Sequence, residues 1–198
     1  GSPHRIPPHR VNYRANLFAL RSVGVTRVLA INTVGGINPA MPAGHLVVPD
    51  NLIDYTAGRE HTFSDGSVGS ELQHVDFSEP FSAPLRTTLI ECLRDAGVAF
   101  SANGVYAVTQ GPRLETAAEI RKYERDGCDV VGMTAMPEAA LARELGLPYA
   151  MLCVVVNAAA GKASAPITLA DMQRVLAHSM VTVQATLAAF ITSGAGGQ

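Results

Sequence analysis

The residues of this sequence that could do chemistry lie where apolar segments end. The segment 150–156 is wholly apolar and stops at Asn157, which three alanines and a glycine follow. An asparagine at this point can cap a turn, where Asn is common, or it can offer its amide donors and carbonyl acceptor to a ligand. The other segment ends decide between these two interpretations.

Three further segment ends carry small, hydroxylated or acidic residues. Each residue type has a structural alternative: Thr is common in strands, Glu complements the dipole in the first turn of a helix, Met fills cores and paired Gly makes tight turns. Ligands of open α/β sheets bind at the carboxyl ends of strands, so we expect these ends to share one nearly uncharged pocket. The ends are Thr33-Val34-Gly35-Gly36, residues 111–115 with Leu114 and Glu115, and Met133-Thr134.

Strands and helices alternate along the chain, which predicts an α/β fold: a single domain with a mixed, mostly parallel central sheet flanked by helices on both faces. Thr168 and Asp171 have the spacing of a capping box that starts the last helix. Residues 55–80 form a polar, irregular loop of a length that is typical of functional loops. Helices are expected over residues 11–25, 83–97, 115–127, 137–146 and 168–192, and strands over residues 27–36, 44–54, 104–112, 129–133 and 150–157.

The composition is that of one globular domain, because 47% of the 198 residues are hydrophobic and only 16% are charged. We assign residues 1–193 to this domain and residues 194–198 to a disordered tail. The net charge of -2, without a run of Lys or Arg, argues against nucleic-acid binding. No uninterrupted apolar run approaches the length of a membrane span. The scattered cysteines Cys92, Cys128 and Cys153 predict reduced thiols in a cytoplasmic protein and no metal site.

Long stretches of the chain resemble the trimeric purine nucleoside phosphorylases and the related S-methyl-5'-thioadenosine phosphorylases. These stretches are "NTVGGINPAMPAGHLVVPDNLID", "TQGPRLETAAEI" and "DVVGMTAMPEAALARELGLPYA", while "VNYRAN" and "HVDFSEPFS" are closer to the methylthioadenosine branch. The resemblance implies a homotrimer that takes a purine nucleoside and inorganic phosphate and uses no cofactor. His74 resembles the histidine that reaches into the site of a neighbouring subunit, although it also fits an ordinary loop position.

The reaction of this family is phosphorolysis, in which phosphate attacks the anomeric carbon and releases the free base and a sugar 1-phosphate. No protein nucleophile is required, which suits a pocket with little charge. The protein has to hold phosphate beneath the sugar and stabilise negative charge on the departing base. The resemblance implies that Thr33 and Thr134 bind phosphate, that Met133 lies against the ribose, and that Val34 and Gly35 border the substrate.

The family resemblance also indicates the base. The methylthioadenosine branch has Asp at the position of Asn157 and again two residues later, where this chain has Ala159, whereas the 6-oxopurine enzymes have Asn. As the catalytic residue, Asn157 would donate to O6 and accept from a protonated N7. Glu115 lies where 6-oxopurine enzymes have a Glu that accepts from N1–H, a hydrogen that adenine lacks. Leu114 replaces the usual stacking Phe. The expected base is therefore hypoxanthine or guanine.

The 5' end of the sugar indicates the methylthio branch. Enzymes of ordinary nucleosides have a His against the 5'-hydroxyl near the start of the last helix, and this chain has the apolar Leu169 there. A hydroxyl buried against leucine would lack a partner, at a cost of about 1–3 kcal/mol. The expected reaction is phosphorolysis of 5'-methylthioinosine to hypoxanthine and 5-methylthioribose 1-phosphate.

Several alternatives remain open. The chain could be a general 6-oxopurine nucleoside phosphorylase, a methylthioadenosine phosphorylase, or a nucleoside-binding remnant without turnover. The family's first strand, its phosphate turn and an Arg-His pair have no counterpart in this sequence. We expect them to precede Gly1 in the native protein; the alternative is a truncated chain that folds poorly and is inactive. A dinucleotide-binding domain is disfavoured, because no GxGxxG follows an early strand.

Overall fold

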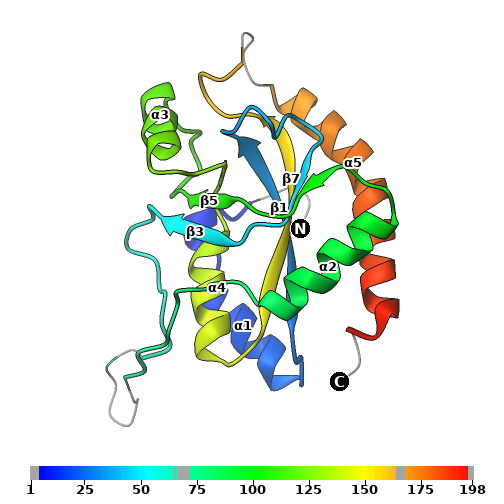
Figure 1. Ribbon diagram of the computed structural model, residues 1–198. Coiled ribbons are helices and arrows are strands. Elements are labelled where there is room, and N and C mark those ends of the chain that lie inside the picture. The colour runs from blue at the N-terminus through cyan, green and yellow to red at the C-terminus, as the bar shows by residue number, and fades with distance from the viewer. Residues whose placement is uncertain (1–4, 65, 67–71, 164–167, 196–198) are drawn as a thin grey trace.

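A mixed sheet of seven strands, counted over the described residues, forms the centre of the computed structural model (Figure 1). The structure describes residues 5–64, 66, 72–163 and 168–195. The strand order is β3-β5-β6-β1-β7-β2-β4, with antiparallel pairing of β1 with β6 and of β2 with β7 and parallel pairing elsewhere. The strands are β1 (Val28–Gly36), β2 (Leu46–Val47), β3 (Asn51–Asp54), β4 (Phe100–Ser101), β5 (Val105–Val108), β6 (Val130–Gly132) and β7 (Tyr149–Ala158).

Helices cover both faces of this sheet, as Figure 1 shows. Helices α1 and α4 pack on one face, and α2 and α5 pack on the other. The predicted α/β class with a mixed, mostly parallel sheet is confirmed. The helices are α1 (Tyr13–Ser22), α2 (Ala83–Asp95), α3 (Ala117–Arg125), α4 (Ala135–Glu144) and α5 (Leu169–Phe190), with a 3₁₀ turn at Pro8–Arg10 and a π-helical turn at Ile191–Ala195.

The central strand β7 explains the apolar run that precedes Asn157. Successive side chains of a strand point to opposite faces, so a strand covered on both faces is apolar at every position. Met151 and Val155 pack into the core beneath α1 and α4, while Leu152 and Val154 pack into the core beneath α2 and α5. Burying each of these side chains stabilises the fold by roughly 1.5–3 kcal/mol.

The strand predicted over residues 44–54 is wrong as a single element. It divides into β2 and β3, which lie at opposite sides of the sheet order. The break falls at Pro49, which has no N–H to donate to a ladder. There the Arg86 side chain of α2 donates to the carbonyl of Pro49 at 2.8 Å. The two-residue strand β4, which pairs with β2, is too short to give a sequence pattern.

The helical segment Leu169–Ser193, which is α5 with the turn that follows it, is long and apolar enough to cross a membrane, with a mean hydropathy of 1.5 in an 18-residue window. Its inner face packs against β7 and α2 and buries Val183 and Phe190. A single helix of this kind is weak evidence for a membrane, since apolar helices of a packed core pass the same test. The outer face of α5 leaves Val181 71% exposed.

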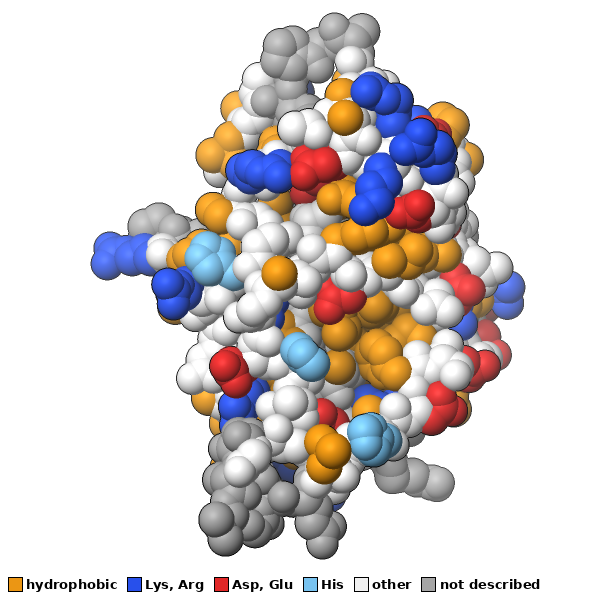
Figure 2. Space-filling view, turned by 90° about the vertical axis from the view of Figure 1, so that its left-hand side faces the viewer, with side chains coloured by type: hydrophobic (Ala, Val, Ile, Leu, Met, Phe, Trp, Pro, Cys, Tyr) orange, Lys and Arg blue, Asp and Glu red, His pale blue; other side chains and the backbone are white. Residues whose placement is uncertain are grey.

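The surface on the left of Figure 1 carries a mixture of side chains (Figure 2). Hydrophobic side chains gather toward the middle of this face, and Lys and Arg side chains gather toward the end where α3 lies. Helix α3 has Lys122 and Arg125 in its last turn, where positive charge complements the helix dipole. Residues 196–198 of the predicted tail lie outside the described residues.

Candidate active site

All but one of the site residues that the sequence analysis selected line one cavity of about 950 Å³, and the exception is His74. Its walls come from the ends of β1, β6 and β7, from the first turns of α5, and from the N-terminal segment 5–11. The structure therefore brings together segment ends that are far apart in the sequence. The selected residues that line the cavity are Thr33, Val34, Gly35, Leu114, Glu115, Met133, Thr134, Asn157, Ala159 and Leu169.

A β-bulge positions Asn157 in the cavity. Val34 of β1 pairs with Val155, but the next residue, Gly35, pairs with Asn157, so β7 contains one extra residue at this point. Bulges of this kind change the direction of the side chains that follow them. Gly35 packs closely here, because a Cβ on it would lie 3.2 Å from Val131 Cγ1 and in van der Waals contact, at 3.4 Å, with Asn157 Nδ2. The bulge gives the apolar strand a polar tip.

The Asn157 amide retains one donor and one acceptor for a ligand. Its Nδ2 donates one hydrogen to the carbonyl of Ala158 at 2.7 Å. A side-chain amide has two N–H hydrogens and a carbonyl oxygen, so one hydrogen and Oδ1 remain. Ala159 follows on the cavity floor and is 2% exposed.

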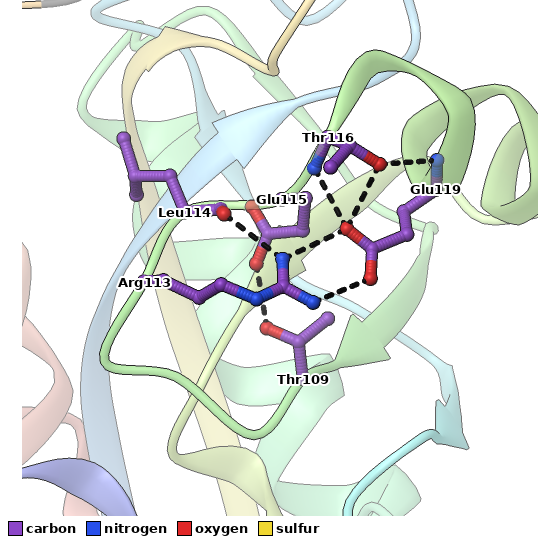
Figure 3. A network of polar contacts seen from close by, with 6 residues as sticks. All are labelled: Thr109, Arg113, Leu114, Glu115, Thr116 and Glu119. Atoms are coloured by element: carbon purple, nitrogen blue, oxygen red, sulfur yellow. Dashed lines mark hydrogen bonds and ion pairs between the residues drawn. The ribbon is translucent and has the colours of Figure 1, made fainter.

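Glu115 is oriented by a residue that the sequence analysis missed, Thr109 (Figure 3). The Thr109 hydroxyl lies 2.7 Å from Glu115 Oε1 and 3.3 Å from the Gly132 carbonyl, and its single hydrogen goes to the nearer carboxylate. Thr109 is buried, and it follows directly after β5. Because a buried hydroxyl requires a partner, a threonine directly after a buried strand was the signal that could have identified Thr109.

The loop that carries Leu114 and Glu115 is held by an ion pair and a helix cap, both drawn in Figure 3. Arg113 Nη2 lies 2.7 Å from Glu119 Oε1 and Nη1 lies 2.9 Å from Oε2. Glu119 also forms a capping box with Thr116 at the start of α3. The bond from Arg113, together with the Thr116 backbone N–H, lowers the pKa of Glu119 to about 2. This cap was not anticipated, whereas the predicted cap at Thr168 is present, with Asp171 N donating to Thr168 Oγ1.

The hydroxyl of Thr134 is oriented by Asn32, which the sequence analysis also missed. Asn32 Nδ2 donates to Thr134 Oγ1 at 2.8 Å, so the Thr134 hydrogen is free to point to another acceptor. Asn32 is 5% exposed within a strand of apolar neighbours. An amide in such a position has to be paired, and this was the signal that could have identified it. Thr33, on the same strand, is exposed to the cavity.

One wall of the cavity is an apolar face of α5. Leu169 begins this face, and Met172, Leu176 and Met180 continue it at spacings of a single helix side. The N-terminal segment contributes Ile6 and further apolar residues to the opening. Leu169 was selected from the sequence, whereas Met172, Leu176 and Met180 were not, although their helical spacing was visible.

Two of the expected features do not line the cavity. Gly36 lies just beyond it, and a Cβ there would collide with the Met41 carbonyl, so this glycine serves the packing of a loop. His74 is exposed in the long loop and is not among the lining residues. Within the described lining, Arg5 and Glu115 are the charged side chains. The cavity is therefore nearly uncharged, as predicted.

The comparisons with known proteins agree with this geometry. The model of the phosphorylase superfamily matches residues 2–192. The chain belongs to this superfamily. It is 58% identical over 193 residues to a phosphorylase of Pseudomonas syringae pv. tomato that is named a probable S-methyl-5'-thioinosine phosphorylase, covering 98% of this chain and 78% of that protein.

Two further relatives of this phosphorylase are named for other nucleosides. The 6-oxopurine nucleoside phosphorylase of Pyrococcus furiosus is 46% identical over 176 residues, which cover 87% of this chain and 66% of that protein. A methylthioadenosine phosphorylase of Schistosoma mansoni, solved in complex with adenine, superposes with a TM-score of 0.93 at 32% identity. That superposition covers 100% of this chain and 76% of the solved chain.

Proposed function

We propose that this phosphorylase cleaves 5'-methylthioinosine with inorganic phosphate to give hypoxanthine and 5-methylthioribose 1-phosphate. The observation that carries the proposal is that one cavity joins Asn157, Glu115 and the apolar face of α5. The first two groups suit a 6-oxopurine and the third suits a thioether. The name of the Pseudomonas relative supports the same substrate.

The base is recognised at its oxygen and at two nitrogens. As the bond to the base breaks, N7 takes up a proton from solvent; Asn157 then accepts from N7–H through Oδ1 and donates its remaining amide hydrogen to O6. Glu115 accepts from N1–H, and the Thr109 hydroxyl, which donates to Glu115 Oε1, holds the carboxylate in place. Adenine has no N1–H and carries an amino group in place of O6, so it leaves both groups mispaired.

Phosphate supplies the nucleophile. One of its oxygens attacks the anomeric carbon as the bond from that carbon to N9 breaks, and the bonding electron pair passes into the purine. Thr33 and Thr134 donate hydroxyl hydrogens to phosphate, and Met133 lies against the ribose. The protein contributes position and electrostatic stabilisation of the departing base, which are the main sources of rate enhancement in such a reaction.

The apolar face of α5 receives the 5'-methylthio group. Met172 and Leu176 lie one and two turns beyond Leu169 on this face. A thioether needs no hydrogen bond, whereas the 5'-hydroxyl of inosine loses its water partners there without a replacement. The wall therefore favours the methylthio nucleoside over inosine.

The proposal includes the assembly, the cellular location and the requirements of the reaction. Inorganic phosphate is a co-substrate, and no cofactor or metal takes part. The protein is a cytoplasmic homotrimer, in which His74 reaches the site of a neighbouring subunit. The exposure of His74 outside the cavity of its own chain is compatible with that role, and the free buried cysteines suit a reducing compartment. Gel filtration of the protein with light scattering tests the trimer.

A substrate comparison tests the proposed function. The protein is incubated with 5'-methylthioinosine, inosine or 5'-methylthioadenosine, each with and without phosphate, and the released base is measured. We expect hypoxanthine from 5'-methylthioinosine only when phosphate is present, with a higher kcat/KM than for the other two nucleosides. Absence of hypoxanthine, or its release at the same rate without phosphate, contradicts the proposal.

A general 6-oxopurine nucleoside phosphorylase is the second candidate. The identity to the Pyrococcus furiosus enzyme favours it, and Asn157 and Glu115 suit its substrates equally well. The same experiment separates the candidates, because a general enzyme cleaves inosine at least as well as 5'-methylthioinosine. Calorimetry that detects hypoxanthine binding without any turnover would instead indicate a nucleoside-binding protein.

A further inference from the structure

The long loop over residues 55–80 contains one buried arginine, Arg59. Arg59 is 7% exposed, although the described part of this loop contains no helix or strand. A charged side chain is buried at a high cost unless its donors are all paired. The Arg59 guanidinium lies 6.0 Å from the centre of the Tyr13 ring, which packs beneath it.

All five N–H hydrogens of Arg59 are used in hydrogen bonds. The acceptors are one side-chain amide and four backbone carbonyls, and no carboxylate is bonded to Arg59 among the described residues. Such a complete set is the most that a guanidinium can form. Nε donates to Gln110 Oε1 at 3.2 Å, Nη1 to the carbonyls of Met133 and Met136 at 2.8 and 2.5 Å, and Nη2 to the carbonyls of Thr109 and Gln110 at 3.1 and 2.9 Å.

These acceptors lie directly behind two parts of the candidate active site. Thr109 follows β5, and its hydroxyl orients Glu115. Met133 follows β6 and lines the cavity together with Thr134. Arg59 therefore ties the segment that carries the base-recognising carboxylate to the segment that carries the ribose and phosphate contacts.

The loop around Arg59 is itself anchored. Glu60 Oε2 lies 2.9 Å from Arg14 Nη1 of α1, and the Phe63 backbone N–H donates to Glu144 Oε2 of α4 at 2.7 Å. These two contacts restrict the loop on the C-terminal side of Arg59, and on its N-terminal side the Ala57 backbone N–H donates to Gln110 Oε1 at 3.3 Å. A guanidinium held in this way has a fixed position relative to both strand ends.

We propose that Arg59 is a positioning residue of the phosphorolysis, which holds Glu115 and the Met133-Thr134 segment at the separation that the transition state requires. This inference rests on the proposed function. Base recognition and phosphate contact are needed at the same moment, when the bond to the base breaks. A loss of Arg59 thus affects the reaction even though its side chain does not touch the substrate.

Arg86 provides a matched control. This arginine of α2 also holds backbone carbonyls together, with Nε 2.8 Å from the Pro49 oxygen and Nη2 2.7 Å from the Ala102 oxygen. Neither acceptor lines the cavity. Removing Arg86 breaks a comparable set of bonds away from the site, so it reports the effect of lost stability alone.

The experiment compares Arg59→Met, Arg59→Lys and Arg86→Met with the wild type. For each protein, the unfolding midpoint, the kcat and KM for 5'-methylthioinosine, and the calorimetric affinities for hypoxanthine and adenine are measured. We expect Arg59→Met to lower kcat about 10- to 100-fold, the size of effect that a small misplacement of reacting groups produces. We also expect the preference for hypoxanthine over adenine to fall about tenfold, because Glu115 loses its fixed position. Arg86→Met should change neither quantity.

The lysine variant keeps the positive charge but has three N–H hydrogens, so it cannot reach all five acceptors. We expect Arg59→Lys to fold and to lower kcat almost as much as Arg59→Met does. If Arg59→Met does not fold, Arg59→Lys takes its place in the comparison. The proposal is overturned if the Arg59 variants keep the hypoxanthine preference of the wild type, or if Arg86→Met lowers kcat and this preference equally. If the wild type performs no phosphorolysis, the proposed function fails, whereas the binding comparison still tests the role of Arg59.

Discussion

The Thr109 hydroxyl donates a 2.7 Å hydrogen bond to Glu115 Oε1, while the Thr109 backbone N–H donates to the Gly132 carbonyl at 2.8 Å. The backbone of Thr109 therefore joins β5 to β6, while its hydroxyl orients the Glu115 carboxylate. Thr109→Val keeps the shape of the side chain and removes the donor. Because a hydrogen bond to a charged group contributes roughly 1.5–3 kcal/mol, we expect kcat/KM for 5'-methylthioinosine to fall roughly tenfold or more in a base-release assay.

Thr186→Val is the control for this change. Thr186 is equally buried, and its hydroxyl donates to the Thr182 carbonyl at 2.9 Å within α5, away from the cavity. We expect it to leave the ratio of kcat/KM for 5'-methylthioinosine and 5'-methylthioadenosine unchanged. If Thr109→Val leaves that ratio unchanged as well, Glu115 does not read the N1 position of the base.

Asn157→Asp tests whether the Asn157 amide selects a 6-oxopurine over a 6-aminopurine. The aspartate has no N–H to donate to O6, but its two oxygens can accept from the 6-amino group of adenine. We expect the ratio of kcat/KM for 5'-methylthioinosine to that for 5'-methylthioadenosine to fall by at least about tenfold, since a buried mispaired group costs about 1–3 kcal/mol. The ratio is measured by following both bases in one competition assay.

The same substitution at Asn12 serves as a control for Asn157. Asn12 caps α1 by accepting from the Ala15 backbone N–H, and an aspartate performs this role equally well. Asn12→Asp should therefore leave the substrate ratio at its wild-type value. An unchanged ratio in Asn157→Asp would show that the amide does not select the base.

The fold was predictable because its signals are local. The run at Ala150–Val156 is apolar at every position, which indicated a strand buried on both faces, and the alternation with helices indicated the class. The order of strands was not predictable, because β1 pairs with β6 in the antiparallel sense over only two registered pairs. That pairing depends on the whole fold rather than on either segment.

The residues at the segment ends that line the cavity were predictable from the sequence, whereas the residues that support them were not. Asn157 and Glu115 stand at segment ends, where the family pattern identifies them. Asn32 and Arg59 act through bonds to groups distant in sequence, such as the 102-residue separation between Asn32 and Thr134, whereas Thr109 bonds to Glu115 six residues away. The bulge at Gly35 and Asn157 likewise appears only when β1 and β7 are paired. A single sequence shows which side chain is polar, but not which partner satisfies it.

Leu169→His tests the assignment of the sugar pocket. Leu169 stands at the first position of α5 and lines the cavity. A histidine there offers a hydrogen-bond partner to a 5'-hydroxyl, which otherwise loses about 1–3 kcal/mol. We expect kcat/KM for inosine to rise roughly tenfold relative to 5'-methylthioinosine. Gln173→His, on the same helix but outside the cavity, should leave this ratio unchanged, and equal behaviour of the two variants would remove Leu169 from the pocket.

A half-buried carboxyl group on α4, that of Glu138, makes stability depend on pH. Burial raises the pKa of Glu138 above its ordinary value of 4.5, while the bond from the Tyr149 hydroxyl at 2.7 Å partly opposes this. The folded protein therefore keeps the Glu138 proton to a higher pH than the unfolded chain does. Between the two pKa values the folded state binds more protons, so the free energy of unfolding falls as the pH rises.

Glu138→Gln should remove this dependence. Glutamine keeps an oxygen that can accept from Tyr149 and cannot ionise, so the stabilisation present below pH 4.5 in the wild type persists as the pH rises. We expect the variant to show a flatter profile of unfolding free energy above that pH, measured by urea denaturation at a series of pH values. Glu91→Gln, at an exposed position of α2, should follow the wild-type profile. A Glu138→Gln profile as steep as that of the wild type would mean that Glu138 is ionised in the folded protein at no cost.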